Sequence, residues 1–380
     1  MRIIVVGGAR PNFVKVAPLL RALGATRRFS STFVHTGQHY DEAMSAVFLA
    51  QLGLPAPAFE LGIGSGTHAA QTAAVMTRFE PVLREVQPHV VVVVGDVNST
   101  LACALTASKF TLERPFTSGL GPRTRPIVAH VEAGLRSGDL DMPEEINRRA
   151  TDAIADLLFT TEASAGEHLR REGIADEQVH FVGNLMIDSL LTMVEAARAA
   201  RAAAPSTAAG SRYLLLTLHR PGNVDDAVHL RALLAAVEAG AAADGLPIVF
   251  PVHPRTRARL AAAGVALTAP RWHLIDPVGY LEFVGLMDGA AVVATDSGGI
   301  QEETTVLGVP CVTLRTSTER PITVSHGTNR LAGTDPAAIT AAVRAALAAP
   351  SAPRPPPPLW DGQTAPRIVA VLERLLPAST

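Results

Sequence analysis

Short apolar runs recur along the 380-residue chain, and each is followed by a polar or glycine-containing turn and then by a helical pattern. The runs span residues 3–6, 90–94, 127–131, 157–160, 213–218, 248–252 and 291–294. Apolar runs of this length that alternate with helices are typical of parallel strands buried on both faces of a sheet. The pattern therefore predicts an α/β fold with doubly wound sheets.

The alternation stops once along the chain and then starts afresh. Residues 193–211 are rich in alanine and arginine and end in Pro-Ser-Thr-Ala-Ala-Gly-Ser, which indicates a helix followed by a linker. We therefore expect two similar open-sheet domains, residues 1–200 and 206–350. Residues 348–358 are proline-rich and should be extended. Residues 363–376 have apolar residues at helical spacing, which predicts a helix that docks back on one of the domains.

The composition excludes several classes of protein. There are 33 Lys and Arg residues against 35 Asp and Glu, so the net charge of -2 offers no basic surface to nucleic acid or to an anionic membrane. The longest aliphatic run, 90–94, is too short to cross a bilayer, and the first apolar run is too short for a signal peptide. Cys103 and Cys311 lie in apolar surroundings, which fits buried thiols in a reducing compartment. We expect a cytoplasmic protein.

Charged and polar residues follow the predicted strands directly. Ligands of open parallel sheets bind beyond the carboxyl ends of the strands, where these turns converge. The turns concerned are residues 7–12, 95–98, 130–136, 217–220, 253–255 and 296–299. Their distribution over both halves of the chain predicts a cleft between two domains.

One of these turns suits an anion. In Asp296-Ser297-Gly298-Gly299, two glycines between a strand and a helix let backbone N–H groups approach a diphosphate at the helix N-terminus. An ordinary turn with Asp296 or Ser297 as N-cap is the alternative. Arg10 and Lys15, one of only two lysines, lie in the first turns of another predicted helix. Cations there oppose the helix dipole, which favours an anionic ligand over a solvated first turn.

Three carboxylates stand out as candidates for acid and base chemistry. Asp96 and Glu132 follow buried strands, and Glu144 lies at a predicted helix start after Pro143. Carboxylates in such places can have raised pKa values and serve as general acid or base. For Glu144 an ordinary first-turn role is the alternative. His219 differs from most of the histidines because it ends a strand.

In chain order these residues form a set of motifs similar to one known family. The motifs are Gly-Ala-Arg-Pro-Asn-Phe-Val-Lys at 8–15, Thr-Gly-Gln-His at 36–39, Gly-Asp at 95–96, His-Val-Glu-Ala-Gly-Leu-Arg at 130–136, Pro-Glu-Glu-Ile-Asn-Arg at 143–148, Leu-His-Arg at 218–220, Asp-Ser-Gly-Gly-Ile-Gln-Glu-Glu at 296–303 and Thr-Glu-Arg-Pro at 318–321. The ordered set is far more specific than any one motif. The chain resembles the non-hydrolysing UDP-N-acetylglucosamine 2-epimerases.

This resemblance implies a GT-B-like fold of two Rossmann-like domains, with an interdomain cleft that binds a UDP-sugar. Such proteins are usually homodimers, and residues 351–380 would return to the N-terminal domain. It implies catalytic roles for Asp96, Glu132, Glu144, His219 and Arg148. It assigns the nucleotide and its diphosphate to Arg10, Lys15, His219, Ser297, Gly298, Gly299, Glu303 and Arg320, with Glu303 on the ribose and Phe283 near the uracil. Arg136 and Arg148 would orient the carboxylates or the sugar.

The reaction that the resemblance implies explains why carboxylates and a cationic diphosphate site occur together. UDP leaves C1 as a base removes the C2 proton, which gives a 2-acetamidoglucal, and UDP re-adds after protonation on the other face. The C2 proton is weakly acidic, so departure of UDP runs ahead and builds positive charge at C1 that carboxylates stabilise. At least two of the three carboxylates must then differ in protonation state. The route needs no metal and no nicotinamide cofactor.

Two motifs differ from those of the family. Three other functions also stay open. Family members that their own substrate activates have different residues at the positions of 38–44 and 220–223, so we expect weak or absent substrate activation. The stretch 111–125 is longer than usual and by topology lies on the face away from the cleft. The rivals are a hydrolysing epimerase that releases N-acetylmannosamine and UDP, a GT-B glycosyltransferase, and a non-catalytic UDP-sugar sensor.

Overall fold

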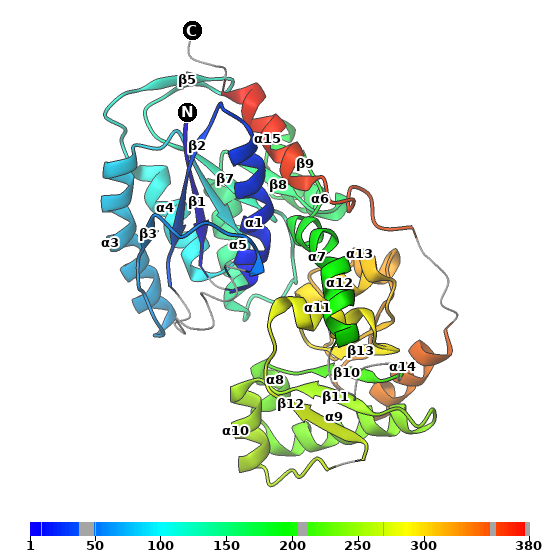
Figure 1. Ribbon diagram of the computed structural model, residues 1–380. Coiled ribbons are helices and arrows are strands. Elements are labelled where there is room, and N and C mark those ends of the chain that lie inside the picture. The colour runs from blue at the N-terminus through cyan, green and yellow to red at the C-terminus, as the bar shows by residue number, and fades with distance from the viewer. Residues whose placement is uncertain are drawn as a thin grey trace. The chain divides into compact units, whose positions relative to one another are not determined.

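The chain folds into two compact units, Met1–Ser189 with Pro358–Thr380 (unit 1) and Leu190–Pro357 (unit 2). The computed structural model (Figure 1) describes residues 1–8, 10–37, 49, 51–203, 212–268, 270–349 and 355–376, without the side chains of residues 10, 11, 202 and 203. The motif at 38–44, most of the predicted linker and part of the proline-rich stretch lie outside these residues. Among the described helices, none is both long and apolar enough to span a membrane.

The described strands of unit 1 form one parallel sheet in the order β3-β2-β1-β4-β7-β8-β9. The strands are β1 Arg2–Gly7, β2 Ser30–His35, β3 Phe59–Glu60, β4 Val90–Val94, β7 Ile127–Val131, β8 Leu157–Thr160 and β9 Val179–Phe181. The chain runs outward from β1 to β3 and then crosses back to pair β4 with β1. The turns after β1 and β4 therefore diverge at a switch point, where open sheets bind ligands.

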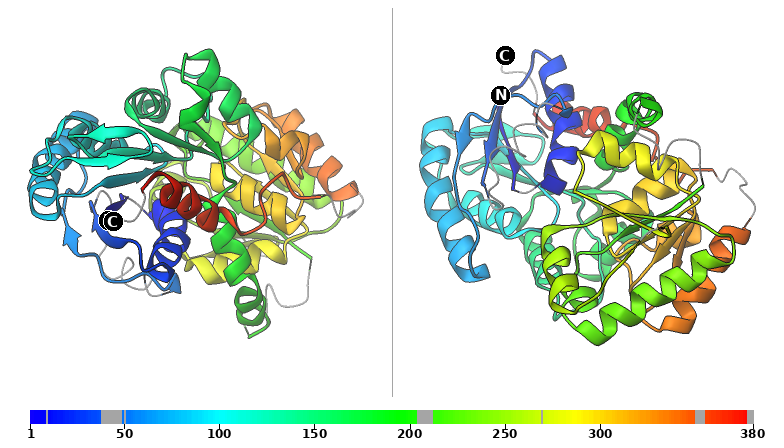
Figure 2. Two further views of the ribbon diagram at one scale, coloured as in Figure 1. Left: turned by 90° about the horizontal axis from the view of Figure 1, so that it is seen from above. Right: turned by 60° about the horizontal axis from the view of Figure 1, so that its bottom comes forward.

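Helices cover both faces of this sheet. They are α1 Arg10–Ala25, α3 His68–Val86, α4 Asn98–Lys109, α5 Pro143–Ile154, α6 Ala163–Arg171 and α15 Thr364–Leu375, with a short 3-10 turn at Asp176–Gln178. Helix α7 Leu185–Ala203 begins in unit 1, and its residues from Leu190 on belong to unit 2. The last helix packs against the first, as Figures 1 and 2 show. Asp188 accepts the backbone N–H groups of Thr364 and Ala365, and the indole of Trp360 donates to the carbonyl of Thr161. The end of the chain is thus part of unit 1.

A small antiparallel hairpin interrupts the pattern of unit 1. It consists of β5 Phe116–Ser118 and β6 Gly121–Arg123. Its Phe116 ring contacts the ring of His89, which directly precedes β4, with centroids 4.9 Å apart. The hairpin therefore lies at the amino ends of the strands, which confirms that the stretch 111–125 lies away from the carboxyl edge.

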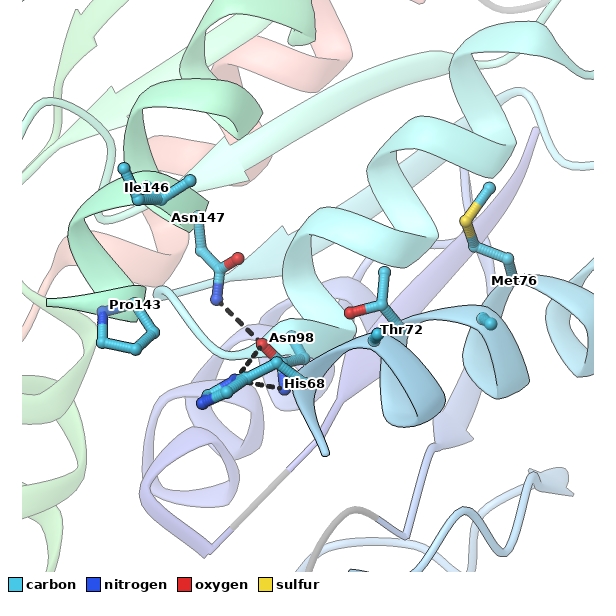
Figure 3. A pocket seen from close by; sticks show the side chains of 9 residues that line it. His68, Thr72, Met76, Asn98, Pro143, Ile146 and Asn147 are labelled. Atoms are coloured by element: carbon cyan, nitrogen blue, oxygen red, sulfur yellow. Dashed lines mark hydrogen bonds between the residues drawn. The ribbon is translucent and has the colours of Figure 1, made fainter. Parts of the chain in front are cut away.

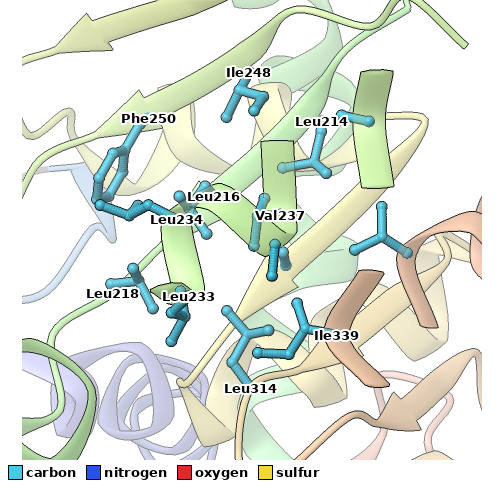
Figure 4. Packing of buried hydrophobic residues seen from close by; sticks show 14 of the residues in the cluster. Leu214, Leu216, Leu218, Leu233, Leu234, Val237, Ile248, Phe250, Leu314 and Ile339 are labelled. Atoms are coloured by element: carbon cyan, nitrogen blue, oxygen red, sulfur yellow. The ribbon is translucent and has the colours of Figure 1, made fainter. Parts of the chain in front are cut away.

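The described strands of unit 2 repeat the arrangement in the order β12-β11-β10-β13-β14-β15. They are β10 Leu214–Thr217, β11 Ile248–Pro251, β12 Trp272–Ile275, β13 Val292–Thr295, β14 Cys311–Thr313 and β15 Asn329–Leu331. The helices are α8 Pro221–Val224, α9 Ala227–Ala242, α10 Pro254–Ala262, α11 Tyr280–Asp288, α12 Gly298–Leu307, α13 Ile322–Ser325 and α14 Pro336–Ala348. Leucines of β10 and α9 pack with Ile248, Phe250 and Ile339 in its core (Figure 4). Its switch point lies between β10 and β13.

The two parallel sheets confirm the predicted doubly wound α/β class. Three predicted strands, 90–94, 127–131 and 157–160, match β4, β7 and β8 residue for residue. Both cysteines are buried free thiols, as expected, and burial raises the pKa of Cys311 to about 12. The apolar-run analysis did not list β2, β3, β9, β12, β14 and β15. Of these, β3, β9, β14 and β15 have at most three residues, which is too short to show a run.

Candidate active site

The switch point of unit 1 brings together the first turns of α1, the end of β4 and the end of β7. Gly95, directly after β4, has a φ of +71°, and a Cβ there would lie 3.2 Å from the side-chain nitrogen of Asn12 and 3.6 Å from Glu132 Oε2. Asn12 in turn donates to the carbonyl of Val94 at 3.0 Å. Glycine therefore allows the turn that carries Asp96 to pass close to Glu132. The side chain of Arg10, also predicted here, lies outside the described part.

Glu132 forms a buried ion pair with Lys15. Lys15 Nζ lies 2.5 Å from Glu132 Oε2, and the residues are 5% and 3% exposed. The other oxygen, Oε1, is buried and has no hydrogen-bond partner among the described residues. The backbone of Glu132 has a φ of 70°, which is uncommon for a residue other than glycine. A residue with a strained backbone and one unsatisfied carboxylate oxygen is typical of functional sites.

Asp96 is held by a second ion pair. Arg148 donates from Nε and Nη2 to Asp96 Oδ2, at 3.0 and 2.8 Å, and from Nη1 to Glu145 Oε2 at 2.7 Å. Arg148 and Glu145 are buried on α5, whereas the side chain of Asp96 is 29% exposed. Asn147 also donates to the backbone carbonyl of Asp96. The pairing agrees with the prediction that Arg148 orients a carboxylate.

Glu144 lies in the first turn of α5, directly after Pro143, and is half-buried. Its carboxylate makes no hydrogen bond or ion pair with the described residues. The first-turn position of Glu144 is thus observed, and its catalytic role stays a prediction.

Arg136 pairs with none of the three predicted carboxylates and instead contacts Asp152 at 2.8 Å and Glu172 at 2.6 Å. Burial alone would lower the pKa of Arg136, but its bonds to these two carboxylates raise it.

A pocket of about 550 Å³ opens beside this cluster, between α3, α4 and α5. Figure 3 shows its polar corner, where Asn98 contacts His68 and accepts a hydrogen bond from Asn147 at 3.2 Å. Met76 and Ile146 contribute to its apolar lining. The sequence analysis did not anticipate this pocket, because its residues come from three separated helices.

The switch point of unit 2 centres on Asp296. The Nδ1 atom of His219 lies 2.8 Å from Asp296 Oδ1, and the carboxylate also accepts the backbone N–H of Arg220 at 2.9 Å. Burial alone would raise the pKa of Asp296, but its hydrogen bonds with His219 and the backbone lower it. Because an ionised carboxylate only accepts, Nδ1 carries a proton. The half-exposed imidazole is therefore oriented so that Nε2 is available to a ligand.

Helix α12 begins at the two predicted glycines. Ser297 occupies the N-cap position, but its side chain makes no capping hydrogen bond, and Asp296 bonds to His219 instead. Ser297 is thus the N-cap residue, as the alternative had it, but without a capping bond from its side chain. A Cβ at Gly298 would lie 2.8 Å from Arg320 Nη1, so the glycine allows this guanidinium to reach the helix start. The arrangement agrees with the predicted anion site; Gly299 is the next helical residue.

Buried carboxylates pair with two arginines of unit 2, Arg315 and Arg320. Arg320 Nε lies 2.8 Å from Glu302 Oε1, and Arg315 donates both guanidinium arms to Glu319 at 2.8 and 2.9 Å. Burial alone would raise the pKa of Glu319, but the hydrogen bonds from Arg315 and the charge of Arg320 lower it strongly. The fully buried Glu302 and Glu319 are structural counter-ions for the arginines.

Glu303, the residue predicted to contact the ribose, is held in place by a tyrosine. Tyr280 on α11 donates to Glu303 Oε1 at 2.7 Å, and both residues are buried. Burial, together with the neighbouring carboxylate, raises the pKa of Tyr280 well above its ordinary value, so it stays a donor. Phe283, predicted near the uracil, lies one turn further along α11 and is half-buried.

The structure places further residues beside the predicted set, among them Glu145, Asp152, Tyr280 and Asp296. Glu145 had a local signal, because it lies three residues before Arg148 on one predicted helix, and Asp296 lies in the glycine-containing turn that the sequence singled out. Asp152 contacts His130, 22 residues away in sequence, Tyr280 contacts Glu303, 23 residues away, and the partners of Asp296 are more than 70 residues away. Such contacts follow from the topology and not from local spacing.

Comparison with known sequences gives one family. The sequence model of the UDP-N-acetylglucosamine 2-epimerase family matches residues 21–373. The UDP-N-acetylglucosamine 2-epimerase of Methanocaldococcus jannaschii is 42% identical over 339 residues, which cover 88% of each chain. The UDP-2,3-diacetamido-2,3-dideoxy-D-glucuronate 2-epimerase of Pseudomonas aeruginosa is 40% identical over 336 residues, again 88% of each chain.

Solved structures agree with the sequences. The crystal structure of M. jannaschii UDP-GlcNAc 2-epimerase in complex with UDP-GlcNAc and UDP matches with a TM-score of 0.86 and 39% identity, over 98% of this chain and 99% of that chain. The Neisseria meningitidis enzyme bound to UDP-GlcNAc matches with a TM-score of 0.80 and 27% identity over the same shares. These matches confirm the GT-B-like fold class, and with the sequence matches they show that the chain belongs to the UDP-N-acetylglucosamine 2-epimerase family.

Proposed function

We propose that the chain interconverts UDP-N-acetylglucosamine and UDP-N-acetylmannosamine at C2, without hydrolysis, by eliminating and re-adding UDP. The observation that carries the proposal is the presence of three carboxylates in three different settings in unit 1. Glu132 is buried against an ammonium, Asp96 is paired with a guanidinium, and Glu144 has no partner among the described residues. Inverting a carbon through its proton requires a base on one face and an acid on the other, and different settings separate these roles.

In the first half of the reaction a carboxylate takes the C2 proton. The electrons of the C2–H bond form the C1=C2 double bond, and the C1–O bond breaks so that UDP leaves with its electron pair. Positive charge at C1 develops first, and a second carboxylate stabilises it. Protonation of C2 from the opposite face and attack of UDP on C1 complete the epimerisation.

In this proposal unit 2 binds the leaving group. His219, Arg320, Ser297 and the N-terminal turn of α12 neutralise charge on the diphosphate, while Glu303 binds the ribose and Phe283 contacts the uracil. Arg10 and Lys15 are assigned to the diphosphate as well. The crystal structure of the M. jannaschii relative with UDP-GlcNAc and UDP supports a UDP-sugar as the ligand.

Incubation with UDP-N-acetylglucosamine in D2O, followed by NMR, tests the proposal. We expect deuterium at C2 in a mixture of the two UDP-linked sugars. Free N-acetylmannosamine and UDP as the only products would identify a hydrolysing epimerase instead. Absence of C2 exchange would refute both epimerase reactions on this sugar.

A second candidate substrate follows from one comparison. The relative named for UDP-2,3-diacetamido-2,3-dideoxy-D-glucuronate is 40% identical, close to the 42% of the M. jannaschii relative. The D2O experiment should therefore be run with both nucleotide sugars, and the ratio of their kcat/KM values identifies the preferred one. Four other expectations stay predictions. They are the homodimer, the domain limits 1–200 and 206–350, the return of residues 351–380 to the N-terminal domain, and the cytoplasmic location. Light scattering of the purified chain tests the dimer.

A further inference from the structure

His130 is a polar residue in the interior of a strand. It lies in β7, is fully buried, and is surrounded along the strand by aliphatic residues. Both of its ring nitrogens have partners: Nε2 contacts the carbonyl of Gly95 at 2.8 Å, and Nδ1 contacts Asp152 Oδ1 at 2.6 Å. Nothing in the proposed reaction uses this side chain directly.

The partners determine where the protons are. A backbone carbonyl only accepts, so Nε2 carries a proton that it donates to Gly95. The other oxygen of Asp152 accepts the backbone N–H of Gly134 at 3.0 Å and lies 2.8 Å from Arg136 Nη2. A carboxylate that accepts from these two donors is ionised, so Nδ1 carries a proton as well. His130 is therefore an imidazolium at the buried end of a row of alternating charges that runs through Asp152 and Arg136 to the exposed Glu172.

Burial alone would raise the pKa of Asp152, but the charge and hydrogen bond of His130, followed by those of Arg136, lower it. The groups that face the imidazole are thus the Gly95 carbonyl from the end of β4 and Asp152 from α5. Arg136 and Gly134 reach the same carboxylate from the turn after β7, and Glu172, at the end of α6, closes the row.

The hydrogen bonds of His130 connect the segments that carry the three predicted carboxylates. Gly95 directly precedes Asp96. His130 itself lies two residues before Glu132. Asp152 lies on α5, the helix that carries Glu144, one turn beyond Arg148.

We propose that His130, held doubly protonated, is a positioning residue that fixes Asp96, Glu132 and Glu144 relative to one another. It acts through Gly95 and Asp152 and touches no substrate. The effect of His130 on the reaction rate rests on the proposed epimerase function. Its protonation and its effect on the turns at residues 95–98 and 132–136 do not. A displacement of about 1 Å at a catalytic group can lower a rate by roughly 100-fold.

Two substitutions separate the two hydrogen bonds. His130→Gln keeps a donor near the position of Nε2, and His130→Asn keeps one near the position of Nδ1. We expect both to lower kcat by on the order of 100-fold while UDP affinity changes by less than about threefold. His89→Gln is the matched control, since His89 is half-buried at the amino edge of the same sheet and accepts a hydrogen bond from the backbone of Arg2. It should leave kcat unchanged.

Two measurements do not depend on activity. Nitrogen NMR of the wild-type chain at pH 7, with the His130 signals assigned by their loss in His130→Gln, should show two protonated ring nitrogens. Amide hydrogen exchange should accelerate in residues 95–98 and 132–136 of both His130 variants and not in His89→Gln.

Each failure has a distinct meaning. A ring nitrogen without a proton, unchanged exchange in the two turns, or wild-type kcat in both His130 variants would overturn the positioning role. A wild-type chain that does not exchange the C2 proton would refute the proposed function instead, and the NMR and exchange measurements would still decide the role of His130.

Discussion

Each unit has an ion pair at the carboxyl edge of its sheet, and the two pairs differ in which member is exposed. In unit 1 the side chain of Arg148 is 3% exposed and that of its partner Asp96 is 29% exposed. In unit 2 the side chain of Asp296 is fully buried and that of its partner His219 is 48% exposed. The exposed member is the one that a ligand can contact. It is the carboxylate of Asp96 in unit 1 and the imidazole of His219 in unit 2, although the two sheets have the same topology.

The difference shows that the charge of the buried member of each pair determines the charge of the group that is exposed at the edge of the sheet. A buried counter-ion keeps the exposed group charged and oriented, as supporting residues do around metal ligands. In the proposed reaction positive charge develops on the sugar and negative charge on the departing diphosphate. The exposed members of the two pairs thus have opposite charges, as the two separating fragments do in the proposed reaction.

The largest effect is expected at the anionic side of the comparison. Glu132→Gln removes the charge while keeping the shape, so kcat and C2 exchange should fall by about 10²- to 10⁴-fold, as for loss of a general acid or base. UDP affinity, measured by calorimetry, should stay the same. Glu85→Gln, on the exposed face of α3, is the control. Loss of UDP affinity in Glu132→Gln would mean that Glu132 binds the nucleotide.

A buried counter-ion of unit 2 should matter for stability. Glu319→Gln leaves Arg315 and Arg320 with an uncharged neighbour, which should lower the free energy of unfolding by about 3–5 kcal/mol at pH 7. Because the pKa of Glu319 is lowered in the folded state, its contribution is complete above the unfolded value of about 4.3 and is lost as the pH falls toward the folded value.

Urea unfolding at pH 7 and at pH 3.5 measures this dependence. The difference between wild type and Glu319→Gln should shrink in acid, by about 1.4 kcal/mol per pH unit below the unfolded pKa. Exposed Glu282→Gln should show no difference at either pH. An equal loss at both pH values would show that the ionised carboxylate is not what stabilises this region.

The third substitution addresses the His219 pair directly. Asp296→Asn deprives the imidazole of its ionised partner, and kcat/KM should fall by about 10- to 100-fold, the value of one hydrogen bond to a charged group. Asp276→Asn, at a 91% exposed side chain of the same unit, is the control. Steady-state kinetics with unchanged kcat/KM would remove His219 from the proposed diphosphate contacts.

The smallest effect is expected at Lys15. Lys15→Arg keeps the charge but replaces a compact ammonium with a planar fork in a buried site, so KM for the UDP-sugar should rise by roughly tenfold. The other lysine supplies the control: Lys109→Arg, at an exposed position on α4, should have no effect. An unaffected KM in Lys15→Arg would exclude a role for Lys15 in binding.

Local pattern predicted the central strands well, and the reason is physical. The five valines of β4 cannot be anything but a strand buried on both faces, and the turn that follows must then lie at the ligand edge. Pattern could not distinguish Glu144 from Glu145, because adjacent residues of a helix differ by only 100° and either one could face Arg148. The contact of Lys15 with Glu132 joins residues 117 apart, which only the strand order brings together.

The left-handed backbone of Glu132 has a consequence for laboratory evolution. That conformation costs about 1–2 kcal/mol in a residue with a Cβ, and the ion pair with Lys15 must also be desolvated. Combining Glu132→Gly with Lys15→Met would relieve both costs and should raise the melting temperature, while removing a carboxylate to which the proposed function assigns catalysis. A library selected for heat resistance alone would therefore drift toward loss of turnover at this position, so thermostable variants of this chain must be screened for activity in every round.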